Sequence, residues 1–119
     1  MKQNTILLVE DDFLNRRLIR KTLTDAGYKV LEAKNSIEAI EILNNDIVDI
    51  AILDINLGEH EQNGIELSNR IKEKYNIPFI YLTAYDTDEI TSKAIHTKPH
   101  AYITKPFKSV DIIISVELA

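Results

Sequence analysis

In the segment IAILDIN, Ile50–Asn56, four apolar residues lead without interruption into one carboxylate, Asp54. A run this short and apolar on both faces is typical of a strand that is covered on both sides, as in a parallel sheet. Such a strand should end in Asp only where its end faces water or a ligand. Because ligands of open α/β sheets bind at the carboxyl ends of the strands, Asp54 is the first candidate for chemistry.

Composition limits the kind of protein. The 119 residues suffice for one domain with a substantial core, and 45% hydrophobic and 28% charged residues are ordinary globular values. The net charge of -5 argues against direct nucleic-acid binding, which needs a basic surface. The absence of cysteine excludes disulfides, thiolate metal sites and a thiol nucleophile. We see no signal peptide and no membrane-spanning stretch, and expect a cytoplasmic location without membrane contact.

Short apolar runs alternate with amphipathic segments along the chain. The predicted strands are Ile6–Val9, Tyr28–Ala33, Val48–Asp54, Phe79–Leu82 and Ala101–Thr104, and the predicted helices are Phe13–Ala26, Ile37–Asn44, Gly64–Tyr75, Asp86–Thr97 and a last one capped by Ser109. Strict alternation predicts a parallel sheet with right-handed crossovers and helices on both faces. The natural arrangement for five such units is the flavodoxin-like doubly wound α/β fold, with a five-stranded sheet of order 2-1-3-4-5.

The spacing of apolar residues also predicts which helix faces are buried. The side chains expected to point inward are Leu14, Leu18 and Leu23 in the first helix, Ile37, Ile40 and Leu43 in the second, Ile65, Leu67 and Ile71 in the third, Ile90, Ala94 and Ile95 in the fourth, and Val110, Ile113, Ile114 and Leu118 in the last. Asp12 stands where an N-cap belongs, and Asn35–Ser36 offers a cap for the second helix.

Four of the five strands end in a polar group that could do chemistry. These are Glu10 and Asp11 after the first strand, Asp54 after the third, Thr83 after the fourth and Lys105 after the fifth. With the first and third strands adjacent, the carboxylates lie close together and raise one another's pKa. A hard divalent cation removes that cost, and an all-oxygen site with room for water suits Mg²⁺. The histidines stand at no strand end, which argues against zinc: His60, His96 and His100.

A carboxylate beside Mg²⁺ and an ammonium group is a plausible nucleophile for a phosphoryl group, because phosphoryl transfer needs mainly positioning and charge neutralisation. In this interpretation Asp54 attacks and becomes an aspartyl phosphate. Lys105 covers a phosphoryl oxygen, and Thr83 donates its hydroxyl once phosphate is present.

The chain resembles, over nearly its whole length, the response-regulator receiver domain of two-component signal transduction. The resemblance lies in LLVEDD (Leu7–Asp12), ILDIN (Ile52–Asn56), LTA (Leu82–Ala84) and YITKPF (Tyr102–Phe107), which follow in the family's order and at intervals like the family's. Each motif is weak alone, but the ordered set is strong.

The resemblance implies a role for each residue of the acidic group. Asp54 matches the phospho-acceptor and is a metal ligand. Asp11 matches a direct Mg²⁺ ligand, Glu10 a ligand acting through water, and Asn56 the position whose backbone carbonyl completes the metal site. Asp12 falls one place past the acidic pair and is interpreted as a helix cap.

The resemblance also implies the switch. Thr83 and Lys105 match the phosphate contacts, and Tyr102 matches the aromatic residue that rotates inward when the threonine hydroxyl moves. Pro106 matches the family's cis-proline. The implied function is a phospho-acceptor that takes phosphate from the phosphohistidine of a histidine kinase or phosphotransfer domain and loses it by Mg²⁺-dependent self-hydrolysis, without being a turnover enzyme.

Phosphorylation is then expected to change the surface of the fourth helix, fifth strand and fifth helix. That surface would engage a partner, a second copy in a homodimer, or a covalently attached output domain. Residues 1–119 are interpreted as one receiver domain, expected to belong to a longer multidomain protein.

Three other functions fit the sequence less well. A slow phosphohydrolase with an Asp nucleophile would need a second Asp two residues on as general acid, where this chain has Asn56. A flavodoxin-like cofactor site would need a phosphate-cradling loop after the first strand, where Glu10–Asp12 would repel phosphate. A degenerate, phosphate-independent receiver is disfavoured because every site residue is present.

Two segments depart from the family's pattern. The loop Leu57–Asn63 is about two residues longer than usual and lacks the proline that commonly follows the acceptor strand. The segment Thr97–Ala101 lacks the usual glycine before the fifth strand. Both departures concern surfaces around the site rather than its acidic residues.

Overall fold

The computed structural model describes residues 4–57, 63–84 and 87–119, within which one parallel sheet has the strand order β2-β1-β3-β4-β5. The strands are β1 (Thr5–Val9), β2 (Lys29–Ala33), β3 (Ile50–Leu53), β4 (Phe79–Thr83) and β5 (Ala101–Thr104). The helices are α1 (Phe13–Asp25), α2 (Ser36–Asn45), α3 (Asn63–Arg70), α4 (Asp88–His96) and α5 (Ser109–Leu118), with a π-helical segment η1 (Ile71–Tyr75) continuing α3. The predicted doubly wound fold and strand order are confirmed. None of the described helices is long and apolar enough to cross a membrane.

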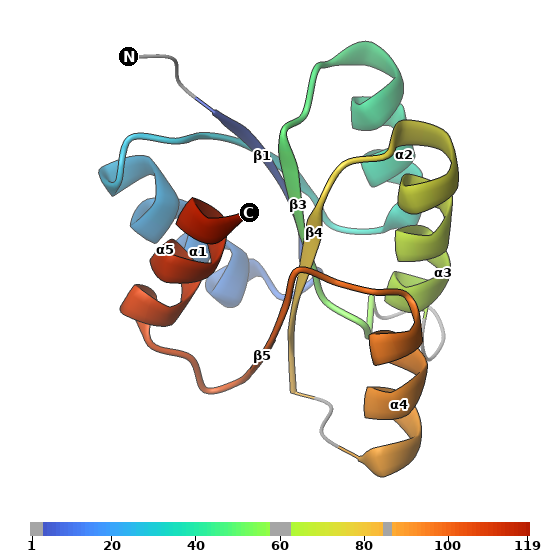
Figure 1. Ribbon diagram of the computed structural model, residues 1–119. Coiled ribbons are helices and arrows are strands. Elements are labelled where there is room, and N and C mark those ends of the chain that lie inside the picture. The colour runs from blue at the N-terminus through green and yellow to red at the C-terminus, as the bar shows by residue number, and fades with distance from the viewer. Residues whose placement is uncertain (1–3, 58–62, 85–86) are drawn as a thin grey trace.

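Helices cover both faces of the sheet (Figure 1). α1 and α5 lie on one face, and α2, α3 and α4 cover the other. Because successive side chains of a strand point to opposite faces, each central strand contributes to two separate cores. Ile52 of β3 packs in the core beneath α1 and α5, whereas its neighbour Leu53 packs in the core beneath α2, α3 and α4. This burial on both faces explains the unbroken apolar run of β3.

The pairing of β1 with β3 positions the site. The two strands run parallel in a register that joins Ile6 to Ile50 and Val9 to Leu53. The residues that follow the last pair therefore emerge side by side at the carboxyl edge of the sheet. β4 and β5 end at the same edge, where Thr83 pairs with Thr104.

Four helices contact the sheet through a pair of buried side chains four residues apart. The pairs are Ile19 and Leu23 in α1, Ala39 and Leu43 in α2, Ile90 and Ala94 in α4, and Ile112 and Val116 in α5. The predicted inward positions are wrong at Leu14, Leu18, Ile37, Ile95, Val110, Ile114 and Leu118, whose side chains are more than half exposed. Each of these short helices buries only a narrow stripe of side chains. Where aliphatic residues also occupy the other sides of the helix, the spacing of aliphatic residues does not identify the buried face. In the third helix Ile65, Leu67 and Ile71 are buried as predicted.

Side-chain caps begin two of the helices, at the predicted Asp12 and, of the pair Asn35–Ser36, at Asn35. Asp12 Oδ1 accepts from the amide of Asn15, and Asn35 Oδ1 accepts from the amide of Glu38 at 2.8 Å. The prediction that Ser109 caps the last helix is wrong, because α5 already begins at Ser109, whose hydroxyl lies 3.4 Å from that of Thr22 on α1. The predicted helix start at Asp86 and residues 58–62 of the long loop lie outside the described residues.

Candidate functional site

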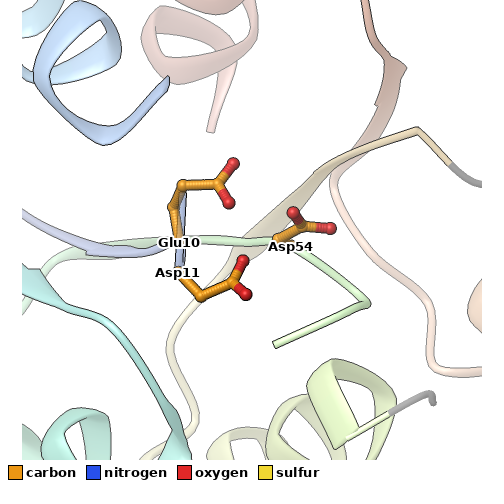
Figure 2. A group of neighbouring side chains, drawn as sticks. All are labelled: Glu10, Asp11 and Asp54. Atoms are coloured by element: carbon orange, nitrogen blue, oxygen red, sulfur yellow. The ribbon is translucent and has the colours of Figure 1, made fainter. Parts of the chain in front are cut away.

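Three carboxylates meet at the carboxyl edge of β1 and β3. Glu10 and Asp54 directly follow the paired residues Val9 and Leu53. The amide of Asp54 donates to the carbonyl oxygen of Val9 at 3.0 Å, which fixes the two strand ends against each other. Glu10, Asp11 and Asp54 each bring one carboxylate oxygen to within 4.8 Å of the others (Figure 2). The structure thus brings together the acidic residues that the sequence analysis singled out.

The turn after β1 separates the roles of three consecutive acidic residues. Glu10 is buried, with only 1% of its surface exposed, whereas Asp11 is exposed. The side chain of Asp12 caps α1, and its amide donates to Oε2 of Glu10 at 3.2 Å. Asp12 is therefore the predicted helix cap, and Glu10 and Asp11 are left to form the acidic group with Asp54.

Lys105 reaches the acidic group from the end of β5. Its Nζ donates to Oε1 of Glu10 at 2.5 Å and to Oδ2 of Asp54 at 3.0 Å. Its amide donates to the carbonyl oxygen of Thr83 at 2.8 Å, which anchors Lys105 to the end of β4. Burial alone lowers the pKa of Lys105, but the hydrogen bonds and charges of Glu10 and Asp54 outweigh burial and raise that pKa above its ordinary value. Lys105 is therefore a fixed positive charge beside the carboxylates.

Glu10 differs from an ordinary carboxylate in its proton affinity. Burial, the largest effect, and the negative charge of Asp54 raise the pKa of Glu10 to about 7, against the lowering effect of the hydrogen bond from Lys105. A cation bound nearby would favour the ionised form of Glu10 and lower this pKa. Glu10 therefore links the charge state of the site to whatever cation occupies it.

The carboxylate of Asp54 is held by both of its oxygens. Oδ1 accepts from the amide of Asn56 at 3.2 Å, and Oδ2 accepts from Lys105. The segment after Asp54 is hydrogen-bonded to α3, since the amide of Gly64 donates to the carbonyl oxygen of Ile55 at 2.9 Å. A Cβ on Gly64 would lie 2.1 Å from the carbonyl oxygen of Asp54, so only glycine allows α3 to begin this close to the site.

The acidic group opens into a small hollow of about 210 Å³. Its lining residues are Glu10, Asp11, Asp12, Asn15, Asp54, Asn56, Thr83, Ala84 and Lys105. Thr83 is buried at the end of β4 and reaches this hollow, as its place in the sequence predicted. Asn15 was missed by the sequence analysis. Its position three residues after the cap Asp12, in the first turn of α1, was the available signal.

A second residue that sequence reasoning missed is Arg16. Its guanidinium donates to the carbonyl oxygen of Glu10 at 3.0 Å and to Oε1 of Glu32 on β2 at 3.2 Å. Only 17% of its side chain is exposed. Arg16 thus ties α1 and β2 to the turn that carries Glu10 and Asp11.

Tyr102, the predicted switch residue, is not among the residues that line the hollow. It lies half-buried on β5, with its ring edge-on to that of Tyr81 at a centroid distance of 5.8 Å. Two residues beyond β5's last residue, Pro106 follows a cis peptide bond, as expected from the resemblance.

The donor set fits a hard divalent cation. Every candidate side-chain ligand is a carboxylate, and one oxygen from each of Glu10, Asp11 and Asp54 lies within 4.8 Å of the other two. The exposed position of Asp11 leaves room for water ligands, which Mg²⁺ commonly retains. Within the described residues the grouping contains no nitrogen or sulfur ligand, so its chemistry favours Mg²⁺ over Zn²⁺.

Comparison with known proteins agrees with this geometry. The family model of the response regulator receiver domain matches residues 6–117. A cyclic di-GMP phosphodiesterase from Thermotoga maritima is 37% identical over 103 residues, which are 86% of this chain and 27% of that protein. The aerobic respiration control protein ArcA of Escherichia coli is 31% identical over 114 residues, which are 96% of this chain and 47% of that protein.

The structural neighbours show the same fold. A crystal structure of a response regulator receiver domain protein from Methanospirillum hungatei has a TM-score of 0.89 and 26% identity, and the match covers 98% of this chain and 93% of that one. In this family, phosphorylation and Mg²⁺ binding at an acidic cluster are general features, and the domains act as phospho-acceptor switches rather than turnover enzymes. The chain therefore belongs to the response regulator receiver domain family of two-component systems.

Proposed function

We propose that Asp54 accepts a phosphoryl group from the phosphohistidine of a histidine kinase or phosphotransfer domain. One Asp54 oxygen attacks phosphorus, the P–N bond to the imidazole breaks, and the freed imidazole takes up a proton. The product is an aspartyl phosphate. The observation that carries this proposal is the position of Asp54, which shares its hollow with two further carboxylates and has the ammonium of Lys105 at 3.0 Å from Oδ2.

The acidic residues are proposed to bind Mg²⁺. Asp11 and Asp54 would be direct ligands, Glu10 would act through water, and Asn56 would contribute its backbone carbonyl. Bound Mg²⁺ supplies positive charge that offsets the repulsion between the carboxylates and an incoming phosphoryl group. Support comes from the all-carboxylate donor set. Burial and the charge of Asp54 also raise the pKa of Glu10, so a bound cation would favour its ionised form.

Lys105 and Thr83 are proposed to hold the phosphoryl group. The Lys105 ammonium would form an ion pair with one phosphoryl oxygen, and the Thr83 hydroxyl would donate to another. Tyr102 would then rotate inward and shift the population of the α4-β5-α5 surface. That surface would act on a separate partner, a second copy or an attached output domain.

The length of the relatives supports the last of these possibilities. This chain spans about a quarter of the Thermotoga protein and about half of ArcA. Residues 1–119 are therefore proposed to be the receiver part of a longer protein. The activity of that whole protein would depend on its other part.

A switch is favoured over a hydrolase by one residue. Asn56, two positions after the nucleophile, is an amide and cannot serve as the general acid that a turnover phosphohydrolase would place there. Loss of phosphate from Asp54 is therefore proposed to be slow self-hydrolysis.

Phosphorylation by a small donor tests the proposal. The chain is incubated with Mg²⁺ and acetyl phosphate, and intact mass and peptide mapping are used to look for a single base-labile phosphoryl group on Asp54. The matched control is Asp54→Asn, which preserves size and removes the nucleophile. No adduct on the parent chain, or an equal adduct on the control, would contradict the proposal, and release of many phosphates per chain would favour the hydrolase.

A further inference from the structure

Three buried hydroxyl groups connect α3, β4 and α4. The hydroxyl of Tyr81 on β4 lies 2.6 Å from Ser68 Oγ on α3 and 2.7 Å from Thr97 Oγ1, directly after α4. Ser68 Oγ in turn lies 2.7 Å from the carbonyl oxygen of Ile65, and Thr97 Oγ1 lies 2.5 Å from that of Ala94. This line of contacts joins two helices through one aromatic residue in the core.

The four contacts need more protons than the three hydroxyls possess. Each hydroxyl has one hydrogen to donate, and the two carbonyl oxygens at the ends can only accept. Burial raises the pKa of Tyr81, so its phenol keeps its single proton at neutral pH. At most three of the four contacts are hydrogen bonds at any moment.

In two arrangements of the three protons, both hydroxyl–hydroxyl contacts are hydrogen bonds, and the contact without a proton is the one to a carbonyl. In the first, Ser68 donates to Tyr81, Tyr81 donates to Thr97, and Thr97 donates to the carbonyl of Ala94 in α4. In the second, the direction of each bond is reversed: Thr97 donates to Tyr81, Tyr81 donates to Ser68, and Ser68 donates to the carbonyl of Ile65 in α3. Every arrangement leaves one pair of oxygens without a hydrogen between them. Losing a carbonyl contact is the less costly choice, because a helix carbonyl can still accept a backbone amide, as that of Ala94 does from Thr97 at 3.1 Å, whereas an empty contact between two hydroxyls at 2.6 or 2.7 Å leaves an additional hydroxyl oxygen accepting nothing.

We propose that Tyr81 is a positioning residue of the switch, because its hydroxyl lets the Thr97 side chain alternate between binding the last turn of α4 and releasing it. The ring of Tyr81 packs edge-on to that of Tyr102 at a centroid distance of 5.8 Å. Tyr81 therefore contacts both Thr97, at the end of α4, and Tyr102, the residue proposed to rotate on phosphorylation. This link to signalling rests on the proposed function, whereas the competition for protons does not.

Three single substitutions separate the two arrangements. Ser68→Ala leaves Tyr81 and Thr97 with two protons for two bonds and favours the bond to α4. Tyr81→Phe also leaves Thr97 free to bind α4. Thr97→Val removes that bond, and Tyr81 can then donate to Ser68 while Ser68 donates to the carbonyl of Ile65 in α3.

Amide hydrogen exchange of the unphosphorylated chain, followed by NMR, reads out the last turn of α4. The reporters are the amides of Thr97 and Lys98, which donate to the carbonyls of Ala94 and Ile95 at 3.1 and 2.9 Å. We expect Ser68→Ala and Tyr81→Phe to slow their exchange, and Thr97→Val to speed it, each by about fivefold, which corresponds to about 1 kcal/mol. Thr97→Ser keeps the hydroxyl and should restore the parent rate.

A purely structural role predicts a different pattern. If all three hydroxyls only stabilise the core, all three substitutions will speed exchange in α3 and α4 alike, and that result would overturn the inference. Unchanged exchange at Thr97 and Lys98 in every variant would also overturn it.

A second arm tests the link to signalling. Titration with beryllofluoride and Mg²⁺ should shift the midpoint in opposite directions for Ser68→Ala and Thr97→Val, because the first favours the Thr97 bond to α4 and the second removes it. A parent chain that fails to respond to beryllofluoride contradicts the proposed function, while the exchange series without any phosphate mimic still decides the inference. Equal midpoints in all variants would overturn the role in the switch.

Discussion

Gly64 lies so close to Asp54 that a Cβ on the glycine would stand 2.1 Å from the Asp54 carbonyl oxygen and 2.6 Å from the Cα of Ile55. The contact is backbone against backbone, so no side-chain rotation can relieve it. We expect Gly64→Ala to lower the free energy of unfolding by about 3 kcal/mol. It should also lower the rate of Asp54 phosphorylation, because α3 or the turn after β3 must move.

The matched control for this substitution is Gly27→Ala. Gly27 has a φ of 99° but nothing within 4 Å of a built Cβ, so its cost is conformational only. That cost should be about 1 kcal/mol, with phosphorylation unchanged. Urea unfolding measures both variants, and equal losses would show that the close approach at Gly64 is not rigid.

Asp11 and Asp12 offer a matched test of metal binding. Both Asp11→Asn and Asp12→Asn remove one negative charge beside the hollow, but Asn at position 12 can still cap α1. We expect Asp11→Asn to weaken Mg²⁺ binding at least about tenfold, and Asp12→Asn to weaken it much less. Isothermal titration calorimetry measures both. Similar losses in the two variants would mean that total charge, rather than ligation by Asp11, holds the cation.

The raised pKa of Glu10 predicts a pH dependence of stability. The folded chain keeps the Glu10 proton up to a pKa of about 7, whereas an exposed glutamate in the unfolded chain loses it near its ordinary pKa of 4.5. Between these pH values the folded state binds more protons, so the free energy of unfolding falls as pH rises. The fall due to this residue is on the order of 3 kcal/mol without metal.

The measurement for Glu10 is urea unfolding from pH 4 to 8 in EDTA, compared with Glu10→Gln. The difference in unfolding free energy between the two chains should change across this range. Saturating Mg²⁺ should reduce that change, because a bound cation favours the ionised carboxylate. If the difference in unfolding free energy between the parent and Glu10→Gln stays constant with pH, the pKa of Glu10 is the same in the folded and unfolded chains.

Arg16 and Arg20 both form ion pairs with Glu32, yet they should contribute unequally to stability. Arg16 is 17% exposed and also binds the carbonyl of Glu10, while Arg20 is 55% exposed. We expect Arg16→Met to cost about 2 kcal/mol, because it leaves a buried carbonyl without its donor, and Arg20→Met to cost less than about 0.5 kcal/mol. Thermal unfolding compares them, and equal costs would contradict a special role for the Glu10 contact.

Lys98 adopts a left-handed backbone conformation, with φ of 58°, just after α4. It stands in the segment where the family usually has glycine, and the left-handed region is unfavourable for a lysine. We expect Lys98→Gly to raise the free energy of unfolding by about 0.5–1 kcal/mol. Asn76→Gly is the control, since Asn76 has a similar φ of 53° but asparagine tolerates this conformation, so its gain should be smaller. A loss of stability in Lys98→Gly would show that the lysine side chain makes a stabilising contact.

Much of the site could be predicted because strand ends are encoded locally. Each central strand is a short apolar run, and the polar residue that follows it is adjacent in the sequence. Once the strands are parallel, Glu10, Asp54, Thr83 and Lys105 must reach one edge of the sheet, and the order of strands brings the first two side by side. The residues that sequence reasoning missed, Asn15 and Arg16, lie on a helix, where orientation is not fixed by chain order.

The helix faces were harder to predict for a physical reason. In α5, aliphatic side chains occupy several sides of the helix, so both the stripe Ile112 and Val116 and the stripe Val110 and Ile114 satisfy a helical spacing. Only contact with the sheet selects between them, and it buries Ile112 and Val116. The same ambiguity placed Leu14 and Leu18 of α1 inward, although both are exposed.

The alternation of strands and helices, the parallel sheet and its acidic, lysine-bearing edge are all readable from the residue order, because they follow from local hydrophobic runs and the residues covalently attached to their ends. Packing between elements selects the helix stripes that are buried and places Gly64 against the backbone of Asp54. It also brings Arg16 to the carbonyl of Glu10 in the turn after β1, and Tyr81 between Ser68 and Thr97. These relationships join segments far apart in the chain, and they exist only once packing has fixed the distance and angle between elements.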